Sequence, residues 1–142
     1  MLVNLEMKLE TRGAGDIVDI TPRLRELIRG SEIMSGSVIV FSPSATSGLT
    51  TLEYEPGLIK DLPQLLERLI PSDCPYHHDK TWQDGNGFSH LRAALIGPGI
   101  TIPFVKGELS LGTWQQVVFL EFDNQARSRR LVVQISGEGK KD

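Results

Sequence analysis

The chain begins with a strict alternation of apolar and polar residues over residues 3–11. The apolar positions of this segment are Val3, Leu5, Met7 and Leu9. A period of two places these side chains on one face, so we expect a half-buried β-strand. Residues 17–20 predict a second, short strand. Residues 38–41 lack polar alternation, which predicts a strand buried on both faces. Apolar stretches predict four further strands, at residues 49–54, 100–105, 114–122 and 131–136.

Three segments have the spacing of amphipathic helices instead. The first has Thr21 as its N-cap and ends at Gly30, a residue type that often terminates helices. The second covers residues 56–70, where Pro63 predicts a break because proline lacks a backbone N–H and clashes with the preceding turn. The third lies near residues 88–96.

This order of elements predicts an α+β fold. Strands interrupted by about three helices, with a run of strands at the end, indicate a mainly antiparallel sheet or sandwich. The length of 142 residues fits one domain, residues 1–142. We find no repeat and no linker long enough to divide it.

Charge and composition exclude some classes of function. The net charge of -3 argues against nucleic-acid binding through a basic surface. A basic group does occur at Arg127, Arg129 and Arg130, where a solvated turn explains it as well as an anion site. No segment approaches the ~20 apolar residues of a membrane helix. Cys74 is the only cysteine, which fits a reducing compartment, so we expect a cytoplasmic protein that binds neither nucleic acid nor membrane.

The segment YHHDKTWQDGNGFSH, residues 76–90, holds all three histidines of the chain. Neutral imidazole is the commonest metal ligand in proteins and a proton carrier near physiological pH. Asp84 lies six residues from both His78 and His90, so the three could form a His–Asp–His metal set. Their spacing matches no short zinc signature, and a solvent-facing polar loop explains the histidines equally well.

The motif DGNG, residues 84–87, has turn chemistry and leads directly into the predicted third helix. Free N–H groups at a helix start, aided by the helix dipole, can hold phosphate or carboxylate. Asn86 and Gly87 are therefore candidates for binding an anion. A plain N-cap formed by Asn86 or Ser89 also explains the motif, and the two interpretations are compatible.

Two further candidates lie outside this loop. Trp114 is expected to be at least partly in the core, yet an aromatic ring beside the amide of Gln115 suits recognition of a flat heterocycle. Glu53 lies in a predicted strand with apolar neighbours, where an unused carboxylate would be costly to bury. We therefore consider Glu53 a candidate general base or metal ligand.

Four segments resemble the YjbQ family, which is also labelled secondary thiamine-phosphate synthase. They are TSGLTTLEYEPG, YHHDKTWQDGNGFSH, LRAALIGPGITIPFVKGELSLGTWQQ and RRLVVQISGE. The resemblance implies a small α+β domain that forms a homotrimer, with polar clefts near the subunit boundaries. It also implies a reaction that joins a pyrimidine diphosphate to a thiazole phosphate.

The family motifs can be placed on individual residues. Its Tyr-x-His element falls on Tyr76 and His78, and its Asp-x-Asn-x-x-x-His element falls on Asp84, Asn86 and His90. Its GTWQ element falls on residues 112–115. A histidine that much of the family carries before the second central strand is Ser44 here. A three-histidine metal centre would therefore keep two histidines, with Asp84, Glu53 or water completing it.

These observations lead to two hypotheses. In the first, the protein is an enzyme acting on a small phosphorylated substrate. Its catalytic residues would be His90, Asp84 and Glu53. Its substrate-binding residues would be Asn86, Gly87, Trp114, Gln115 and Ser44. Its metal ligands would be His78, His90 and Asp84, with zinc or magnesium as the metal. In the second, it is a non-catalytic trimer that binds a metal or small ligand. The residues also permit a metal-dependent hydrolase, although nothing favours it.

Overall fold

The structure is a computed structural model that describes residues 1–140, so the last two residues of the predicted domain lie outside it. Within this range the chain forms eight strands and four helices. The strands are β1 (Leu2–Glu10), β2 (Ile17–Asp19), β3 (Ile33–Phe41), β4 (Ser47–Leu52), β5 (Gly99–Val105), β6 (Glu108–Leu109), β7 (Gln116–Glu121) and β8 (Ser128–Gly139). The helices are α1 (Thr21–Gly30), α2 (Pro56–Leu69), α3 (His77–Trp82) and α4 (Gly87–Ile96).

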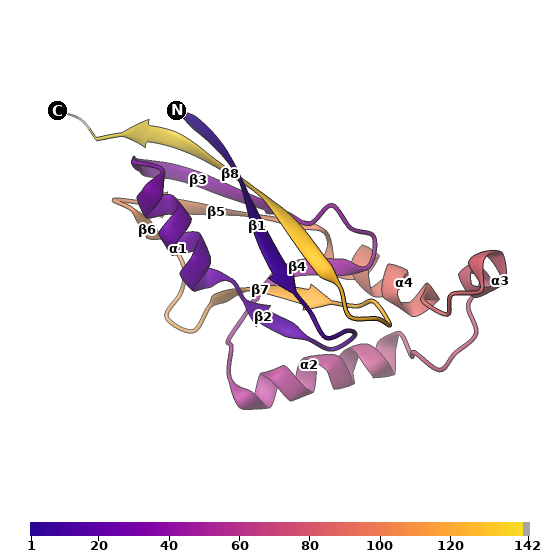
Figure 1. Cartoon of the computed structure of the whole chain (residues 1–142). Coiled ribbons are helices and arrows are strands. Elements are labelled where there is room, and N and C mark those ends of the chain that lie inside the picture. The colour runs from indigo at the N-terminus through magenta and orange to yellow at the C-terminus, as the bar shows by residue number, and fades with distance from the viewer. Residues whose placement is uncertain (141–142) are drawn as a thin grey trace.

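The strands pair into two antiparallel sheets (Figure 1). The larger sheet has the order β1-β8-β3-β5-β6, and the smaller has the order β2-β7-β4. The two ends of the chain meet in the larger sheet, where β1 pairs with β8 along its whole length. The predicted α+β fold with mainly antiparallel strands is confirmed.

Strand β7 is the central strand of the smaller sheet and is buried on both faces. Val117 and Phe119 belong to the main core, which also contains residues of α1 and the larger sheet. Val118 and Leu120 point to the opposite face and pack with Leu66 of α2. The period of two thus places successive side chains of one strand in two different cores.

The prediction that residues 38–41 are buried on both faces is wrong. Val38 and Val40 are fully buried, whereas Ile39 and Phe41 are 39% and 43% exposed. Their side chains lie on the outer face of the larger sheet, because α1 and the smaller sheet pack on the inner face. A continuous apolar run therefore does not distinguish a doubly covered strand from one with an exposed apolar face.

Two local predictions about the helices are also wrong. Pro63 lies inside a continuous α2, because side chains on both sides of it pack against the smaller sheet. Thr21 is not an N-cap: it begins α1, and its hydroxyl accepts a hydrogen bond from the N–H of Val117 (2.8 Å). The side chain of Asp19 accepts from the N–H of Thr21 instead (3.0 Å).

Helix α3 was not predicted. It forms inside the histidine-rich segment that we expected to be a loop. Helices α3 and α4 lie at the end of the molecule opposite the start of β1 and the end of β8, and α3 projects furthest (Figure 1). No helix in residues 1–140 is long and apolar enough to cross a membrane.

Candidate functional site

The start of α4 is held by a carboxylate from the preceding helix. The N–H of Gly87 donates to Asp79 Oδ1 (2.9 Å), and the N–H of Tyr76 donates to Asp79 Oδ2 (3.4 Å). Asp79 therefore joins the beginning of α3 to the beginning of α4. A negative charge is favourable at this position because of the helix dipole. The N–H of Gly87, a candidate for holding phosphate or carboxylate, is already bonded to this internal anion.

Because Asp79 takes the capping role, the side chain of Asn86 is used for other contacts. Asn86 is the N-cap residue of α4, is only 8% exposed, and turns its amide toward His78 and Asp84. With the amide nitrogen facing these groups, Nδ2 donates to His78 Nε2 (3.0 Å) and to Asp84 Oδ1 (2.9 Å). A carboxylate only accepts hydrogen bonds, which favours this orientation over one with the amide oxygen facing Asp84.

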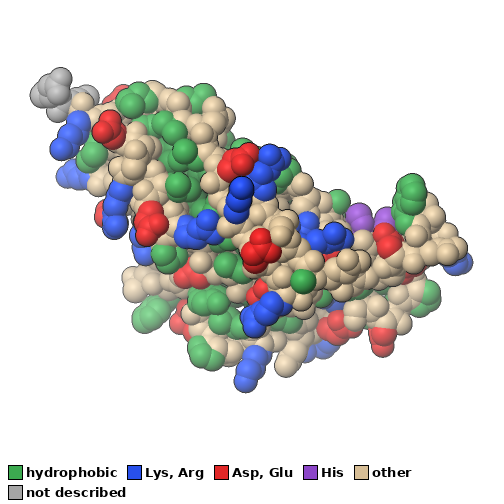
Figure 2. All heavy atoms as spheres, in the orientation of Figure 1, with side chains coloured by type: hydrophobic (Ala, Val, Ile, Leu, Met, Phe, Trp, Pro, Cys, Tyr) green, Lys and Arg blue, Asp and Glu red, His purple; other side chains and the backbone are tan. Residues whose placement is uncertain are grey.

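Imidazole and carboxylate groups of this segment meet around the amide of Asn86. His78 Nε2 lies 3.7 Å from Asp84 Oδ1, and the rings of His78 and His90 are 4.3 Å apart between centroids. The side chains of His78 and Asp84 are 31% and 43% exposed, so a solute can reach them. Figure 2 shows histidine side chains at the surface near the α3 end of the molecule. We call His78, Asp84, Asn86 and His90 the histidine cluster.

A hollow of about 270 Å³ lies next to the histidine cluster. Its lining residues are Ser44, Ala45, Ser47, His90, Ala93, Ala94 and Pro98. We call it the Ser44–His90 hollow. It places Ser44, from the loop between β3 and β4, beside a histidine of α4, as the sequence motifs imply.

The predicted metal site is not confirmed. Among residues 1–140, no three His, Cys, Asp or Glu side chains meet closely enough to hold a metal ion. The amide of Asn86 also occupies the lone pair of His78 Nε2 and one oxygen of Asp84. A metal ion would have to displace that amide from both partners, so the described residues do not fit a divalent metal as they stand.

Three predicted site residues lie elsewhere. Glu53 and Gln115 directly adjoin the paired residues Leu52 and Gln116, which form one end of the β4–β7 ladder. The other end of this ladder is the pair Ser47–Glu121, which is about 17 Å away at the usual rise per residue. Within one chain, Glu53, Trp114 and Gln115 are thus separated from the histidine cluster.

The expected environments of these three residues also differ from those observed. Strand β4 ends before Glu53, and this residue is only half-buried, so its carboxylate carries no large burial cost. Trp114 is 72% exposed and is not part of the core. The amide of Gln115 is engaged locally, donating to Thr51 Oγ1 and accepting from the N–H of Gly112, both at 3.0 Å.

A buried charge network behind Ser44 was missed by the sequence analysis. Glu121 and Asp123 are 0% and 2% exposed, and they form ion pairs with Arg129 and Arg127. Arg129, for which a solvated turn and an anion site were equally good explanations, also donates to Ser44 Oγ (2.7 Å). The sequence did hold a sign of this network. Glu121 ends an otherwise apolar strand and Asp123 follows it closely, and buried carboxylates need cationic partners.

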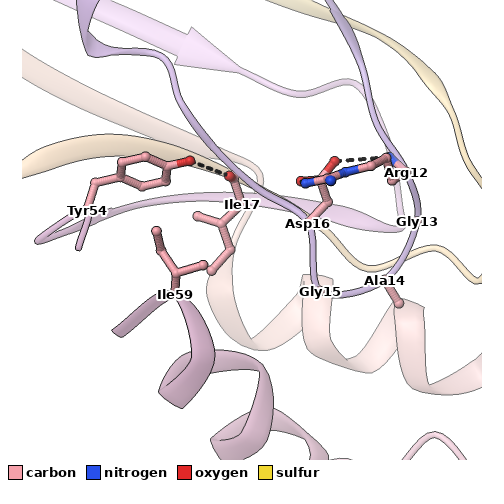
Figure 3. Close-up of a pocket in the computed structure, with 8 residues that line it drawn as sticks. All are labelled: Arg12, Gly13, Ala14, Gly15, Asp16, Ile17, Tyr54 and Ile59. Carbon is pink, nitrogen blue, oxygen red and sulfur yellow. Dashed lines mark hydrogen bonds and ion pairs between the residues drawn. The ribbon is translucent and has the colours of Figure 1, made fainter. Parts of the chain in front are cut away.

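A second hollow, of about 280 Å³, lies on another part of the surface (Figure 3). The turn between β1 and β2 forms one side, where the backbone N–H of Arg12 and its side chain both bind Asp16. Tyr54 and Ile59 form the other side, and the hydroxyl of Tyr54 donates to the carbonyl of Ile17 (3.3 Å). None of the residues that line this hollow was predicted as a site residue.

The fold and the site define a class of protein, namely a small α+β domain of two antiparallel sheets with a histidine cluster at one end. A sequence model described as UPF0047 protein YjbQ-like matches residues 5–138. The chain belongs to this family.

Relatives in several organisms support this assignment over nearly the full length. A UPF0047 protein of Archaeoglobus fulgidus is 38% identical and covers 91% of this chain and 98% of its own. One of Methanothermobacter thermautotrophicus is 37% identical and covers 94% of this chain and 91% of its own. Among solved structures, a hypothetical protein of Aeropyrum pernix K1 is similar, with a TM-score of 0.87, 28% identity and coverage of 96% and 99% of the two chains.

Proposed function

We propose that this protein is an enzyme that forms thiamine phosphate from a pyrimidine diphosphate and a thiazole phosphate at the histidine cluster. In this reaction a ring nitrogen of the thiazole bonds to the methylene carbon of the pyrimidine. The bond from that carbon to oxygen breaks, and pyrophosphate leaves. Such a displacement requires mainly positioning of the two substrates and stabilisation of the leaving charge. The named reaction comes from the family resemblance.

The observation that carries this proposal is the environment of Asn86. Its amide is released from capping by Asp79 and holds His78 and Asp84 in fixed positions next to His90. Preorganised donors and proton carriers at a partly open surface are typical of a site that carries out chemistry. His90 would carry a proton to or from the substrate. Asp84 would accept hydrogen bonds from the substrate.

We further propose that the protein acts as a homotrimer in which Glu53, Trp114 and Gln115 of one copy complete the site of another. These residues are too distant to reach the histidine cluster of their own chain. The exposed ring of Trp114 and the exposed Phe41 on the larger sheet are the kind of apolar surface that a partner covers. Glu53 would then serve as a general base contributed across the boundary.

The proposed reaction can be tested by following pyrophosphate release from purified protein supplied with both phosphorylated substrates. We expect His90→Ala and Asp84→Asn to lower kcat by about 10²–10⁴-fold, because the first removes the proton carrier and the second removes the carboxylate that would accept the substrate's hydrogen bonds. His77→Ala is the matched control, since His77 is the exposed neighbour of His78 on α3, and it should retain full activity.

The alternative is a non-catalytic protein that binds a small ligand at the same place. Asp84 and His90 would then contribute to affinity alone. Saturable binding of the pyrimidine diphosphate without any product, with or without added magnesium or zinc, would establish this alternative and reject the enzyme.

A further inference from the structure

The hydroxyl of Ser44 has an unusual set of partners. Its oxygen accepts one hydrogen bond from Arg129 Nη1 (2.7 Å) and another from the N–H of Thr46 (3.1 Å). A hydroxyl oxygen has two lone pairs and one hydrogen. Both lone pairs of Ser44 are thus occupied by groups that can only donate.

The hydrogen of this hydroxyl is consequently available to a ligand. Within the described chain, the nearest hydroxyl that it could reach is Thr46 Oγ1, at 3.5 Å. That distance is long for an O–H···O hydrogen bond, which is normally 2.5–3.0 Å. Thr46 Oγ1 already accepts from Arg129 Nη2 (2.8 Å) and donates to Asp123 Oδ2 (3.2 Å), so only one of its lone pairs is left for this long contact.

The donor character of Ser44 is enforced by a rigid, charged support. Arg129 Nε donates to Glu121 Oε2 (2.8 Å), and Nη2 binds the other oxygen of the same carboxylate. Glu121 is fully buried, and Thr11 Oγ1 also donates to its Oε2 (3.0 Å). Arg129 therefore cannot turn away, and a charge-assisted bond from its guanidinium polarises the hydroxyl and strengthens it as a donor.

The lining of the Ser44–His90 hollow offers hydrogen-bonding groups to an anion and no acidic side chain that would repel it. Ser44 and His90 both line it, and none of its lining residues is acidic. The carboxylate of Asp84 is not among the groups that line the hollow. A metal cation would need a lone pair from the residue at position 44, whereas Ser44 has only a proton to offer.

We infer that Ser44 is a hydrogen-bond donor to a phosphoryl oxygen of the ligand, and that the Ser44–His90 hollow is a metal-free phosphoryl subsite. This inference rests on the proposed function only in choosing a phosphorylated ligand over other anions. Ser44 is a binding residue, and Arg129 is the residue that positions it. The subsite takes the pyrophosphate end of the substrate, with the heterocycle toward the histidine cluster.

Titration calorimetry with inorganic pyrophosphate, in buffer containing a chelator, tests the subsite directly. We expect the unaltered protein to bind pyrophosphate without any metal. Ser44→Ala should weaken binding by about tenfold or more, because it removes a donor to a charged oxygen. Ser44→Thr keeps the hydroxyl and should bind within a few-fold of the unaltered protein.

Ser37→Ala is the matched control, since Ser37 is also half-buried and bonded to a hydroxyl, that of Ser136 on β8 (3.4 Å). It should leave pyrophosphate binding unchanged. The inference is overturned by equal affinity of Ser44→Ala and the unaltered protein. It is also overturned if the unaltered protein binds no pyrophosphate, or binds it only after a divalent metal is added. These two outcomes are observed on the unaltered protein and need no variant.

These results separate the inference from the proposed reaction. Pyrophosphate binding that depends on Ser44, without formation of thiamine phosphate, would support the subsite and reject the reaction. Formation of thiamine phosphate at an unaltered KM in Ser44→Ala would support the reaction and reject the subsite.

Discussion

At the residue scale, Asp79 determines what its neighbours can do. Its two carboxylate oxygens accept hydrogen bonds from the N–H groups of Tyr76 and Gly87, and so it caps α4 in place of Asn86. Sequence spacing could identify Asn86 as the N-cap of a helical segment, because Asx residues favour that position. It could not show that a carboxylate seven residues earlier would take over the cap and leave the amide to the histidine cluster.

Gly87→Ala should destabilise the fold by about 1–3 kcal/mol, because an added Cβ overpacks the junction of α3 and α4. A Cβ at this position would lie 2.7 Å from Tyr76 Cβ and 3.0 Å from Asp79 Oδ1. Urea denaturation followed by circular dichroism measures the change in the free energy of unfolding.

Gly30→Ala provides the control for this substitution. A Cβ there meets nothing within 4 Å, so the variant should be as stable as the unaltered protein or slightly more stable. Equal stability of Gly87→Ala and Gly30→Ala would show that Tyr76 does not pack against α4 as closely as described.

At the scale of elements, α2 and α4 are tied together by Arg92. This side chain is only 4% exposed, donates to the carbonyl of Ile70 (2.8 Å) and forms an ion pair with Glu67 (2.7 Å). The N–H of Ser72 and the guanidinium of Arg92, in that order of effect, lower the pKa of Glu67 below its ordinary value. The amphipathic spacing of both helices was readable in the sequence, but the contact between them was not, because periodicity indicates which face is buried and not what covers it.

Glu67→Gln should therefore lower stability in a pH-dependent manner. Because the pKa of Glu67 is lower in the folded state, its carboxylate stabilises the fold above the unfolded pKa. This contribution is lost as pH falls through the folded pKa. The side chain is 47% exposed, so we expect a difference of only about 0.5 kcal/mol near neutral pH.

Urea denaturation at about pH 7 and about pH 3 checks this prediction. The free energy of unfolding of Glu67→Gln should be lower than that of the unaltered protein at the higher pH. At the lower pH this difference should become small. The exposed Glu26 on α1 supplies a control substitution, Glu26→Gln, which should change stability less. A difference that grows on acidification would contradict the direction of the pKa shift.

At the scale of the whole molecule, the arrangement of the sheets leaves one apolar surface uncovered. Phe41 of β3 pairs with Val132 of β8, and both side chains are exposed on the outer face of the larger sheet, at 43% and 37%. Contiguous exposed apolar surface often marks a place where another molecule binds, and a second copy of the chain is one such molecule. The same arrangement places Glu53, Trp114 and Gln115 far from the histidine cluster of the same chain.

If this face lies between copies of the chain, Phe41→Asn should dissociate the proposed trimer. A polar amide buried without a partner weakens an interface, and we expect the dissociation constant to rise by about tenfold or more. Sedimentation equilibrium over a range of protein concentrations measures this. Thr101→Ser, a conservative change at a residue paired with Ile39 in the same sheet, should leave assembly intact. A monomeric unaltered protein would reject the proposed trimer altogether.

The sequence by itself determined the α+β class, most of the strands, three of the four helices and the local grouping of His78, Asp84, Asn86 and His90. These features depend on periodicity or on residues close together in the chain. Only the tertiary structure decided that Arg129 meets Ser44 across 85 residues, that β7 is buried between two cores, and that Phe41 faces outward. The physical reason is that periodicity specifies which side chains are buried, whereas the partner of each buried face, and the donor that fills each lone pair, depend on contacts between distant segments.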